Sequence, residues 1–347
     1  MRAPTSLSAL FLATFATFSI SAAQAADKPL ILKAIGQPLA GGPLQKDKEQ
    51  PFFEEFAERT GLPIQFDYKP SDTVGINDAE QLRVLKTGLF DVISIRVLRN
   101  SRDEPMLAGL DLAGAAPDFP TARKLIDAYS AAVDEQLQKK FNTKLLGVWP
   151  YGPQILFCKP EIEDLQDVRG KKVRVTDQNL ARLISALGGT PVPMALPEVH
   201  QSLALGVVDC AISSPGSANA AGWPEVTNYQ FPIGFQSSPN AYGMSLKRWN
   251  SFSEEQQAKI SAAFDTLIND MWEYAEEIHE DALNCNAGRT PCEKGKPYQM
   301  KEVEVTQEDM ALLQAQLLET SVPTWAKACE KSKKGCADEW KALVDLD

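Results

Sequence analysis

The chain has 347 residues, with 46 Asp and Glu against 35 Lys and Arg, and a formal net charge of −11 at pH 7. This acidic balance argues against nucleic acid or an anionic membrane surface as a partner, because both would repel the chain. The length is sufficient for two lobes with separate hydrophobic cores.

The first 25 residues have the composition of a secretory signal peptide. Arg2 supplies a basic start, residues 7–20 are apolar, and Ala23 and Ala25 provide the small side chains of a cleavage site. The apolar stretch is roughly 14 residues long, whereas a membrane-spanning helix needs about 20, although an uncleaved anchor is the alternative. We therefore expect cleavage after Ala25, export, and a mature chain that is not itself embedded in a membrane.

Strands and helices alternate through the next part of the chain. The predicted strands are short apolar runs, and the predicted helices carry apolar residues at helical spacing. In chain order, we predict strands over 30–36, 63–68, 90–97, 144–150 and 154–160 and helices over 51–62, 81–87 and 121–141. Such alternation with apolar strands implies an α/β protein whose sheet is largely buried.

The segment 170–215 has the clearest pattern, with a strand, helix, strand, helix and strand in succession. Its first strand carries an arginine, Arg174, between Val173 and Val175. A guanidinium is costly to desolvate, so an anion is expected near it. That anion is either a ligand carboxylate, which the parallel N–H donors of arginine match, or an acidic side chain in an internal salt bridge.

The motifs that follow Arg174 resemble those of a known family. TPVPM (190–194), Glu198-Val199 and GVVD (206–209) have the order and spacing found in the substrate-binding proteins of TRAP transporters, the tripartite ATP-independent periplasmic importers. The sequence departs from the family pattern at Ser214, where an asparagine is usual, and at Leu196, where an aromatic residue is common.

The resemblance implies a two-lobed α/β periplasmic binding protein of type II-like fold, with a sheet in each lobe and a ligand cleft between them. It places residues 26–151 and 240–279 in lobe I. Residues 152–239 and 280–347 are placed in lobe II, which then carries the C-terminal segment. A hinge motion would close the lobes around the ligand.

A long helix is predicted from Ser253 to Leu283. Ser253 and Gln256 have the spacing of a capping box. Apolar residues then recur every three or four positions, which predicts a helix buried along one side. The residues of this stripe are Ile260, Phe264, Leu267, Met271, Tyr274 and Ile278. In the family, such a helix runs behind both lobes. A helix that is buried in the core can also run behind both lobes, so the two interpretations are compatible.

The resemblance makes Arg174 the residue that binds the carboxylate of the ligand. Gln154 lies 20 residues before it, where some relatives carry a second arginine. Other candidates combine a polar or aromatic side chain with a place near a strand end or turn, although a core or surface position is the alternative for each. They are Ser214, Asn240, Tyr242, Trp149, Tyr151, Arg96 and Gln37.

The expected function is that of an extracytoplasmic solute receptor in the periplasm, which binds a small carboxylate and delivers it to the small and large membrane subunits of a TRAP permease. Neutral Gln154 favours a keto, hydroxy or aromatic monocarboxylate over a dicarboxylate, unless Arg96 faces the cleft. No cofactor is implied. A binding protein for an ATP-driven importer or chemoreceptor is the alternative, and an exported hydrolase a more distant one, since no catalytic motif is present.

Six cysteines in an exported chain are expected to pair. Cys285 with Cys292 and Cys329 with Cys336 are each seven apart, so we predict two local disulfides. Pairing between the two loops is the alternative. Cys158 and Cys210, in apolar strands, form either a third disulfide or two buried thiols. No metal site is expected.

Overall fold

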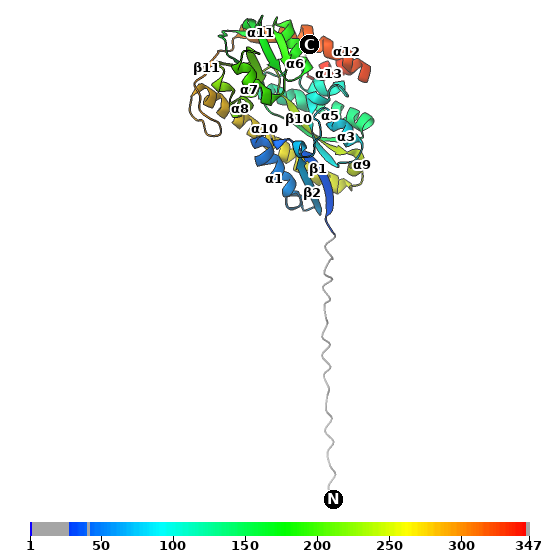
Figure 1. Cartoon of the computed structure of the whole chain (residues 1–347). Coiled ribbons are helices and arrows are strands. Elements are labelled where there is room, and N and C mark those ends of the chain that lie inside the picture. The colour runs from blue at the N-terminus through cyan, green and yellow to red at the C-terminus, as the bar shows by residue number, and fades with distance from the viewer. Residues whose placement is uncertain (2–27, 40–41, 345–347) are drawn as a thin grey trace.

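The structure is a computed structural model that describes Met1, residues 28–39 and residues 42–344. The predicted signal peptide, beyond Met1, lies outside the described residues. The chain forms two lobes, each built on its own sheet (Figure 1). This confirms the predicted two-lobed α/β fold.

The sheet of the first lobe has five strands. Their order is β2 (Ile64–Pro70), β1 (Leu30–Gly36), β3 (Val92–Arg96), β10 (Pro239–Ser245) and β4 (Thr143–Pro150). The first three are parallel, and β10 runs antiparallel to β3 and β4. Because β10 comes much later in the sequence than its neighbours, the chain leaves this lobe and returns to it.

The sheet of the second lobe has six strands. Their order is β11 (Lys301–Glu302), β9 (Tyr229–Phe231), β5 (Ile155–Cys158), β8 (Cys210–Ser213), β6 (Lys172–Val175) and β7 (Thr190–Pro193). Along β5, Leu156 and Cys158 pack in one hydrophobic cluster, and Ile155 and Phe157 pack in another. This alternation shows that both faces of the sheet are covered.

The predicted elements are found with small shifts at their ends, except for the helix predicted over 51–62. There a π-helical turn, η2 (Leu44–Glu49), leads into α1 (Gln50–Glu54) and α2 (Phe56–Thr60). The helical segment thus begins earlier than predicted and is interrupted at Glu55. It ends at Gly61, whose φ of 65° is favourable for glycine.

Two helices are much longer than the rest, α5 (Phe119–Phe141) and α10 (Glu254–Ala287). At the start of α10, Ser253 and Gln256 exchange the hydrogen bonds of the predicted capping box. Buried residues from Ile260 to Ala275 pack in the core of the first lobe, whereas Leu283 packs against the second. The predicted helix that spans both lobes is therefore confirmed.

The remaining helices connect the strands or follow the last of them. They are α3 (Gln81–Lys86), α4 (Val97–Asn100), α6 (Gln178–Ala186), α7 (Leu196–Ala204), α8 (Pro215–Ala220), α9 (Leu246–Trp249), α11 (Gln307–Gln316), α12 (Val322–Ser332) and α13 (Cys336–Val344). Short helical turns lie at η3 (Ser71–Thr73), η4 (Pro105–Leu110), η5 (Leu165–Val168), η6 (Trp223–Glu225) and η7 (Leu317–Ser321).

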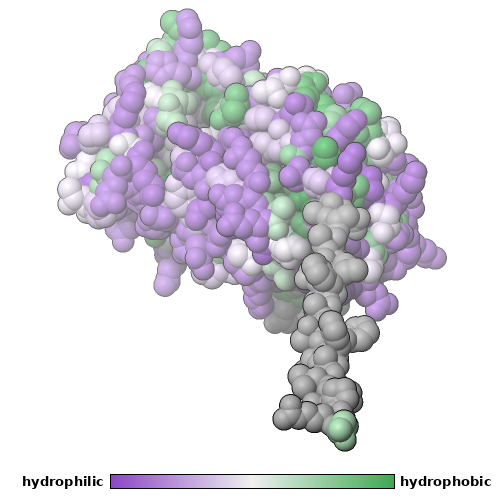
Figure 2. All heavy atoms as spheres, turned by 90° about the horizontal axis from the view of Figure 1, so that it is seen from below, coloured by the Kyte–Doolittle hydropathy of each residue, from purple (hydrophilic) through white to green (hydrophobic). Residues whose placement is uncertain are grey.

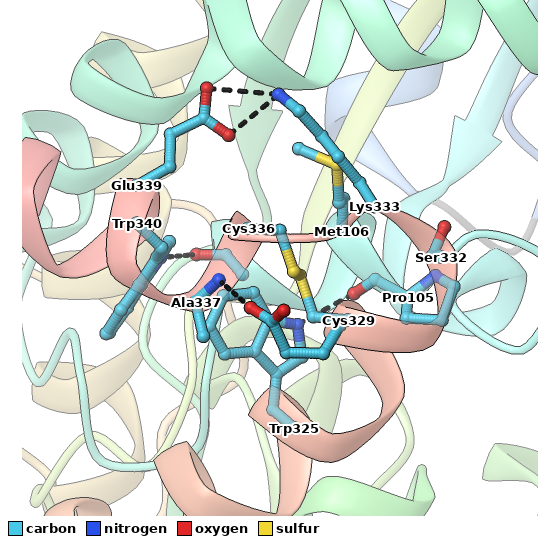
Figure 3. Close-up of a disulfide and its surroundings, with 12 residues drawn as sticks. Pro105, Met106, Trp325, Cys329, Ser332, Lys333, Cys336, Ala337, Glu339 and Trp340 are labelled. Atoms are coloured by element: carbon cyan, nitrogen blue, oxygen red, sulfur yellow. Dashed lines mark hydrogen bonds and ion pairs between the residues drawn. A yellow bond between two sulfur atoms is a disulfide. The ribbon is translucent and has the colours of Figure 1, made fainter.

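The C-terminal helices α12 and α13 lie on the first lobe, which corrects the assignment of all of residues 280–347 to the second. Trp325 and Trp340 are buried in the first core. Their indole N–H groups donate to the carbonyl oxygens of Pro105 (2.8 Å) and Gly109 (2.7 Å) in η4 (Figure 3). Burial of two indoles with satisfied N–H groups explains why the chain crosses back.

All six cysteines are paired. The bonds are Cys285–Cys292, Cys329–Cys336 and Cys158–Cys210. The first two are the predicted local disulfides, and the second of these joins α12 to α13 (Figure 3). Cys158 and Cys210 lie directly opposite each other on the antiparallel strands β5 and β8, so this pair is a third disulfide rather than two thiols.

The face of the molecule seen in Figure 2 is mostly hydrophilic, with apolar residues in small, separate areas. Such a surface fits a chain with a formal net charge of −11. In the part of the chain that the structure describes, no helix is both long enough and apolar enough to cross a membrane.

A buried acid, Glu49, connects η2 to three strands of the first sheet. Its carboxylate accepts hydrogen bonds from the backbone N–H of Gln37 (2.7 Å) and from the hydroxyl groups of Tyr68 and Tyr242 (both 2.9 Å). Burial raises the pKa of Glu49 above its ordinary value, although these hydrogen bonds act in the opposite direction. The network therefore contains a carboxyl group that is costly to ionise.

We predict that non-reducing peptide mapping of the protein will find the three bonds listed above and no others. Each local bond closes a short loop and should contribute roughly 2–3 kcal/mol to stability. Mass spectrometry after digestion, with a reduced and alkylated sample as the control, makes the measurement. Links between the 285–292 loop and the 329–336 loop, or free thiols, would contradict the pairing.

Glu49→Gln should remove a pH dependence of stability. Because the pKa of Glu49 is raised in the folded protein, the unfolded chain loses this proton first as the pH rises above 4.5. The free energy of unfolding of the wild type should then fall relative to the variant, by up to about 1.4 kcal/mol per pH unit, until the folded carboxyl also ionises. Urea denaturation of both proteins from about pH 4 to about pH 8 tests this. A difference that stays constant over this range would contradict it.

Candidate functional site

A cavity of about 260 Å³ lies between the two lobes. The first lobe contributes residues 96–99 at the end of β3, and the second contributes Arg174 from β6 and Ser213, Ser214 and Ser217 at or after the end of β8. The segment that joins β4 to β5 adds Tyr151 and Gln154, and Ser238, directly before β10, comes from the segment that joins β9 to β10. The cavity is thus lined by strand ends and crossing segments of both lobes, where α/β proteins commonly bind ligands.

Arg174 is only 2 % exposed, and its guanidinium is fixed by backbone oxygens. Nε donates to the carbonyl of Met194 (3.0 Å), and Nη1 donates to the carbonyl of Ile212 (2.8 Å). The guanidinium carbon also lies 5.6 Å from the centre of the Trp223 ring. Within the described residues these are its only hydrogen bonds, so three of its five N–H donors have no protein partner.

The alternative of an internal salt bridge is not supported, because Arg174 forms no ion pair in the described part of the chain. Burial lowers the pKa of Arg174 to about 10, and the charge of Arg99 acts in the same direction, while Asp177 opposes both. The group remains a cation at neutral pH. A desolvated cation of this kind is an electrostatic site for an anion.

Arg96 also lines the cavity, together with an acid that lies close to it. Its Nε is 3.6 Å from a carboxylate oxygen of Asp78, and its guanidinium carbon is 4.9 Å from the centre of the Tyr151 ring. The hydroxyl of Tyr151 in turn donates to Gln37 (2.9 Å). The charge of Arg96 is therefore partly balanced within the protein.

Gln154 and Ser214 line the cavity and are partly engaged by the protein itself. The side-chain amide of Gln154 donates to the carbonyl of Gly152 (2.8 Å), which leaves its oxygen as an acceptor. Ser214 is the N-cap of α8, where its hydroxyl accepts from the backbone N–H of Ser217 (3.3 Å) and donates to the Ser217 hydroxyl (2.9 Å). Both side chains are neutral.

Four predicted site residues do not line this cavity, which corrects those predictions. Trp149 is fully buried in the first core. Tyr242 and Gln37 are buried and donate hydrogen bonds to Glu49. Asn240 is also fully buried, with Oδ1 unpartnered among the described residues. Trp149 fills apolar volume in the first core, whereas Gln37 and Tyr242 donate hydrogen bonds to the buried acid.

The cavity wall also contains residues that the sequence did not single out. Asp78 lies in a turn with no motif to mark it. Arg99 lies in α4, three residues after Arg96, and Asp177 is the N-cap of α6, where its carboxylate accepts from the backbone N–H groups of Asn179 and Leu180. The tertiary fold, rather than a local sequence motif, brings the charges of Asp78, Arg99 and Asp177 to the cavity.

A second cavity of about 320 Å³ adjoins the first and shares Tyr151, Ser214 and Ser217 with it. It extends toward α10 and the loop closed by the Cys285–Cys292 bond. The described residues contain no group of three or more His, Cys, Asp or Glu side chains that could hold a metal ion. The first cavity presents guanidinium groups, the carboxylates of Asp78 and Asp177, hydroxyl groups and an amide.

A sequence model of the family described as bacterial extracellular solute-binding protein, family 7, matches residues 39–310. Among curated proteins, the sialic acid-binding periplasmic protein SiaP of Vibrio cholerae is 25% identical over 199 residues, which are 56% of this chain and 61% of SiaP. The alignments with this and two other curated relatives span about a third to two thirds of the length of those proteins.

Two solved structures have the same fold. DctP7 of Bordetella pertussis, an extracytoplasmic solute receptor binding pyroglutamic acid, has a TM-score of 0.74 and 16% identity, over 91% of this chain and 99% of DctP7. A TRAP periplasmic solute-binding protein of Desulfovibrio salexigens with bound orotic acid has a TM-score of 0.75 and 16% identity, over 91% and 98%. Since the family match covers well over half of the chain, the chain belongs to family 7 of the bacterial extracellular solute-binding proteins.

Proposed function

We propose that the protein is an extracytoplasmic solute receptor that binds a small organic acid in the interlobe cleft and delivers it to a TRAP membrane permease. The observation that carries this proposal is the buried, unpaired guanidinium of Arg174 on the wall of a cavity between two lobes. Its plane is fixed by two backbone carbonyls, and its remaining donors suit a carboxylate.

The charges around the cavity favour an acid with one negative charge. Three arginines, Arg96, Arg99 and Arg174, are opposed by two aspartates, Asp78 and Asp177, which leaves a formal excess of one positive charge. Of these three arginines, Arg174 alone is buried and has no acidic partner among the described residues. The body of the ligand would meet neutral groups, which supports a keto, hydroxy or aromatic monocarboxylate.

The ligands of two structural neighbours support this class, whereas a third neighbour is described with bound β-D-galacturonate. Pyroglutamic acid and orotic acid, named for two of the neighbours, each carry one carboxylate and a ring with further hydrogen-bonding groups. A relative from Rhodobacter capsulatus, by contrast, is named for C4-dicarboxylates. The cavity charges of this chain support an acid with one carboxylate.

Membership of the family supports a periplasmic location, with the small and large membrane subunits of a TRAP permease as partners.

Arg174→Ala should nearly abolish binding while leaving the protein folded. Loss of two charge-assisted hydrogen bonds, with the ligand carboxylate left unpaired, should cost roughly 3–5 kcal/mol, or about 10²- to 10³-fold or more in affinity. Arg174→Lys should recover only part of this, because a single ammonium cannot reproduce the paired donors. A thermal-shift screen of monocarboxylates that begins with pyroglutamate would identify a ligand, and titration calorimetry would then compare the variants.

The matched control for this experiment is Arg182→Ala, which removes an exposed arginine from α6 in the same lobe. Its affinity for the acid should equal that of the wild type. If Arg174→Ala also retained near wild-type affinity, Arg174 would not bind the carboxylate.

Asp78→Asn should shift selectivity toward dicarboxylates. The substitution removes the charge that balances Arg96, so a second carboxylate would find a partner there. Because this pair is partly exposed, the effect should be modest, about 0.5–1 kcal/mol or roughly twofold to fivefold in the ratio of affinities for succinate and pyroglutamate. Competition calorimetry measures the ratio.

Asp127→Asn is the control for the selectivity experiment, because Asp127 pairs with Arg123 on α5, away from the cavity. It should leave the ratio unchanged. In the unsubstituted protein, succinate, or a uronate with its heavily hydroxylated body, that bound far more tightly than every keto, hydroxy or aromatic monocarboxylate would overturn the proposed ligand class.

A further inference from the structure

Two of the segments through which the chain passes between the lobes lie side by side. One joins β4 to β5, and the other joins β9 to β10. They are linked by hydrogen bonds from the backbone N–H of Gln154 to the carbonyl of Gln236 (2.7 Å) and from Gly152 to Ser237 (3.1 Å). Phe235 donates in return to the carbonyl of Gln154 (3.0 Å). This pair of segments is the narrow connection about which two separately packed lobes can rotate.

A buried carboxylate holds the second of these segments. Asp111 follows η4 and is fully buried. One oxygen accepts from the backbone N–H (2.8 Å) and the hydroxyl (3.1 Å) of Ser237, and the other accepts from the backbone N–H of Ser238 (2.9 Å). Ser238 has a φ of 53°, a conformation that is unfavourable for serine. The carboxylate thus stabilises a chain conformation that would otherwise be costly.

The residues after Asp111 contact the other elements that cross between the lobes. Leu112 belongs to the first core and Ala113 to the second. The backbone N–H of Gly114 donates to the carbonyl of Phe235 (2.8 Å). Ser321, at the end of η7 where the chain returns to the first lobe, donates its hydroxyl to the carbonyl of Ala113 (2.8 Å). The segment 111–114 therefore contacts both the β9–β10 segment and the end of η7, two of the places where the chain crosses between the lobes.

We infer that Asp111 is a positioning residue that fixes the second crossing segment and so sets the angle between the lobes. Asp111 does not line the cavity. It acts through Ser238 and Pro239, which do line it, and through the neighbouring crossing segment that carries Tyr151 and Gln154. The inference concerns the lobes alone and does not depend on which acid is bound.

Asp111→Asn tests this inference, because an amide keeps the size of the side chain but replaces one acceptor with a donor. Nitroxide labels at Leu89→Cys and Leu205→Cys, exposed positions in the first and second lobes, report the distance between the lobes by pulsed electron paramagnetic resonance. Burial raises the pKa of Asp111 to about 7, so the measurement belongs at about pH 8, where the wild-type group is ionised. The variant should show a shifted mean distance and a broader distribution. Small-angle scattering of unlabelled protein should show a matching change in the radius of gyration.

Asp309→Asn is the matched control. Asp309 is 3 % exposed and also accepts three hydrogen bonds, from the backbone N–H and hydroxyl of Thr306 and from the backbone N–H of Leu165, but all within the second lobe. It should lower the melting temperature without changing the distance distribution. The same distribution in Asp111→Asn as in the wild type would overturn the inference and leave Asp111 a purely structural residue.

If Asp111→Asn does not fold, Ser237→Ala provides the test, because it removes only the hydroxyl bond to Asp111. It should shift the distribution in the same direction by a smaller amount. A folded Ser237→Ala protein with an unchanged distribution and an unchanged radius of gyration would count against the inference.

Discussion

Arg174 is held by oxygen atoms from both strands that flank its own. β6 lies between β7 and β8, and the guanidinium donates to Met194, directly after β7, and to Ile212 in β8. The cation is thus tied to the backbone of three neighbouring strands and cannot move without disturbing the sheet. A charge that is fixed and desolvated in advance attracts an anion more strongly than a mobile, hydrated one, because little ordering remains to be done on binding. The fixed position of the Arg174 guanidinium therefore determines where the cavity carries a buried positive charge.

The place of Arg174 could be predicted from the sequence because its signals are local. An arginine between two β-branched residues, followed by a helix cap and a second strand, defines a strand end within a few residues, and the structure has these elements. The two seven-residue cysteine spacings are local in the same way. The Cys158–Cys210 bond is not, because it depends on the register of β5 with β8, which residue types alone do not determine.

The predictions that failed concern side chains whose direction depends on distant partners. Tyr242 and Gln37 have the polarity of ligand-binding residues, but a buried acid from η2 recruits both, and nothing around Glu49 in the sequence distinguishes it from a surface glutamate. The assignment of the C-terminus failed for a similar reason. Trp325 and Trp340 find carbonyl partners in η4, more than two hundred residues earlier in the chain, and this contact brings the segment back to the first lobe.

The lobes and the connections between them are held by different kinds of contact. Each sheet has its own packed core, while the crossings between the lobes are held by a few polar contacts around Asp111 and by α10. Movement of one lobe against the other needs to break little hydrophobic packing, so open and closed states can lie within a few kcal/mol of each other. A ligand that touches both lobes then shifts this balance only by the difference in its affinity for the two states. Contacts on the first-lobe side, near Arg96 and Asp78, would thus bear on closure as well as on selectivity, whereas the backbone carbonyls that fix Arg174 belong to the second lobe alone.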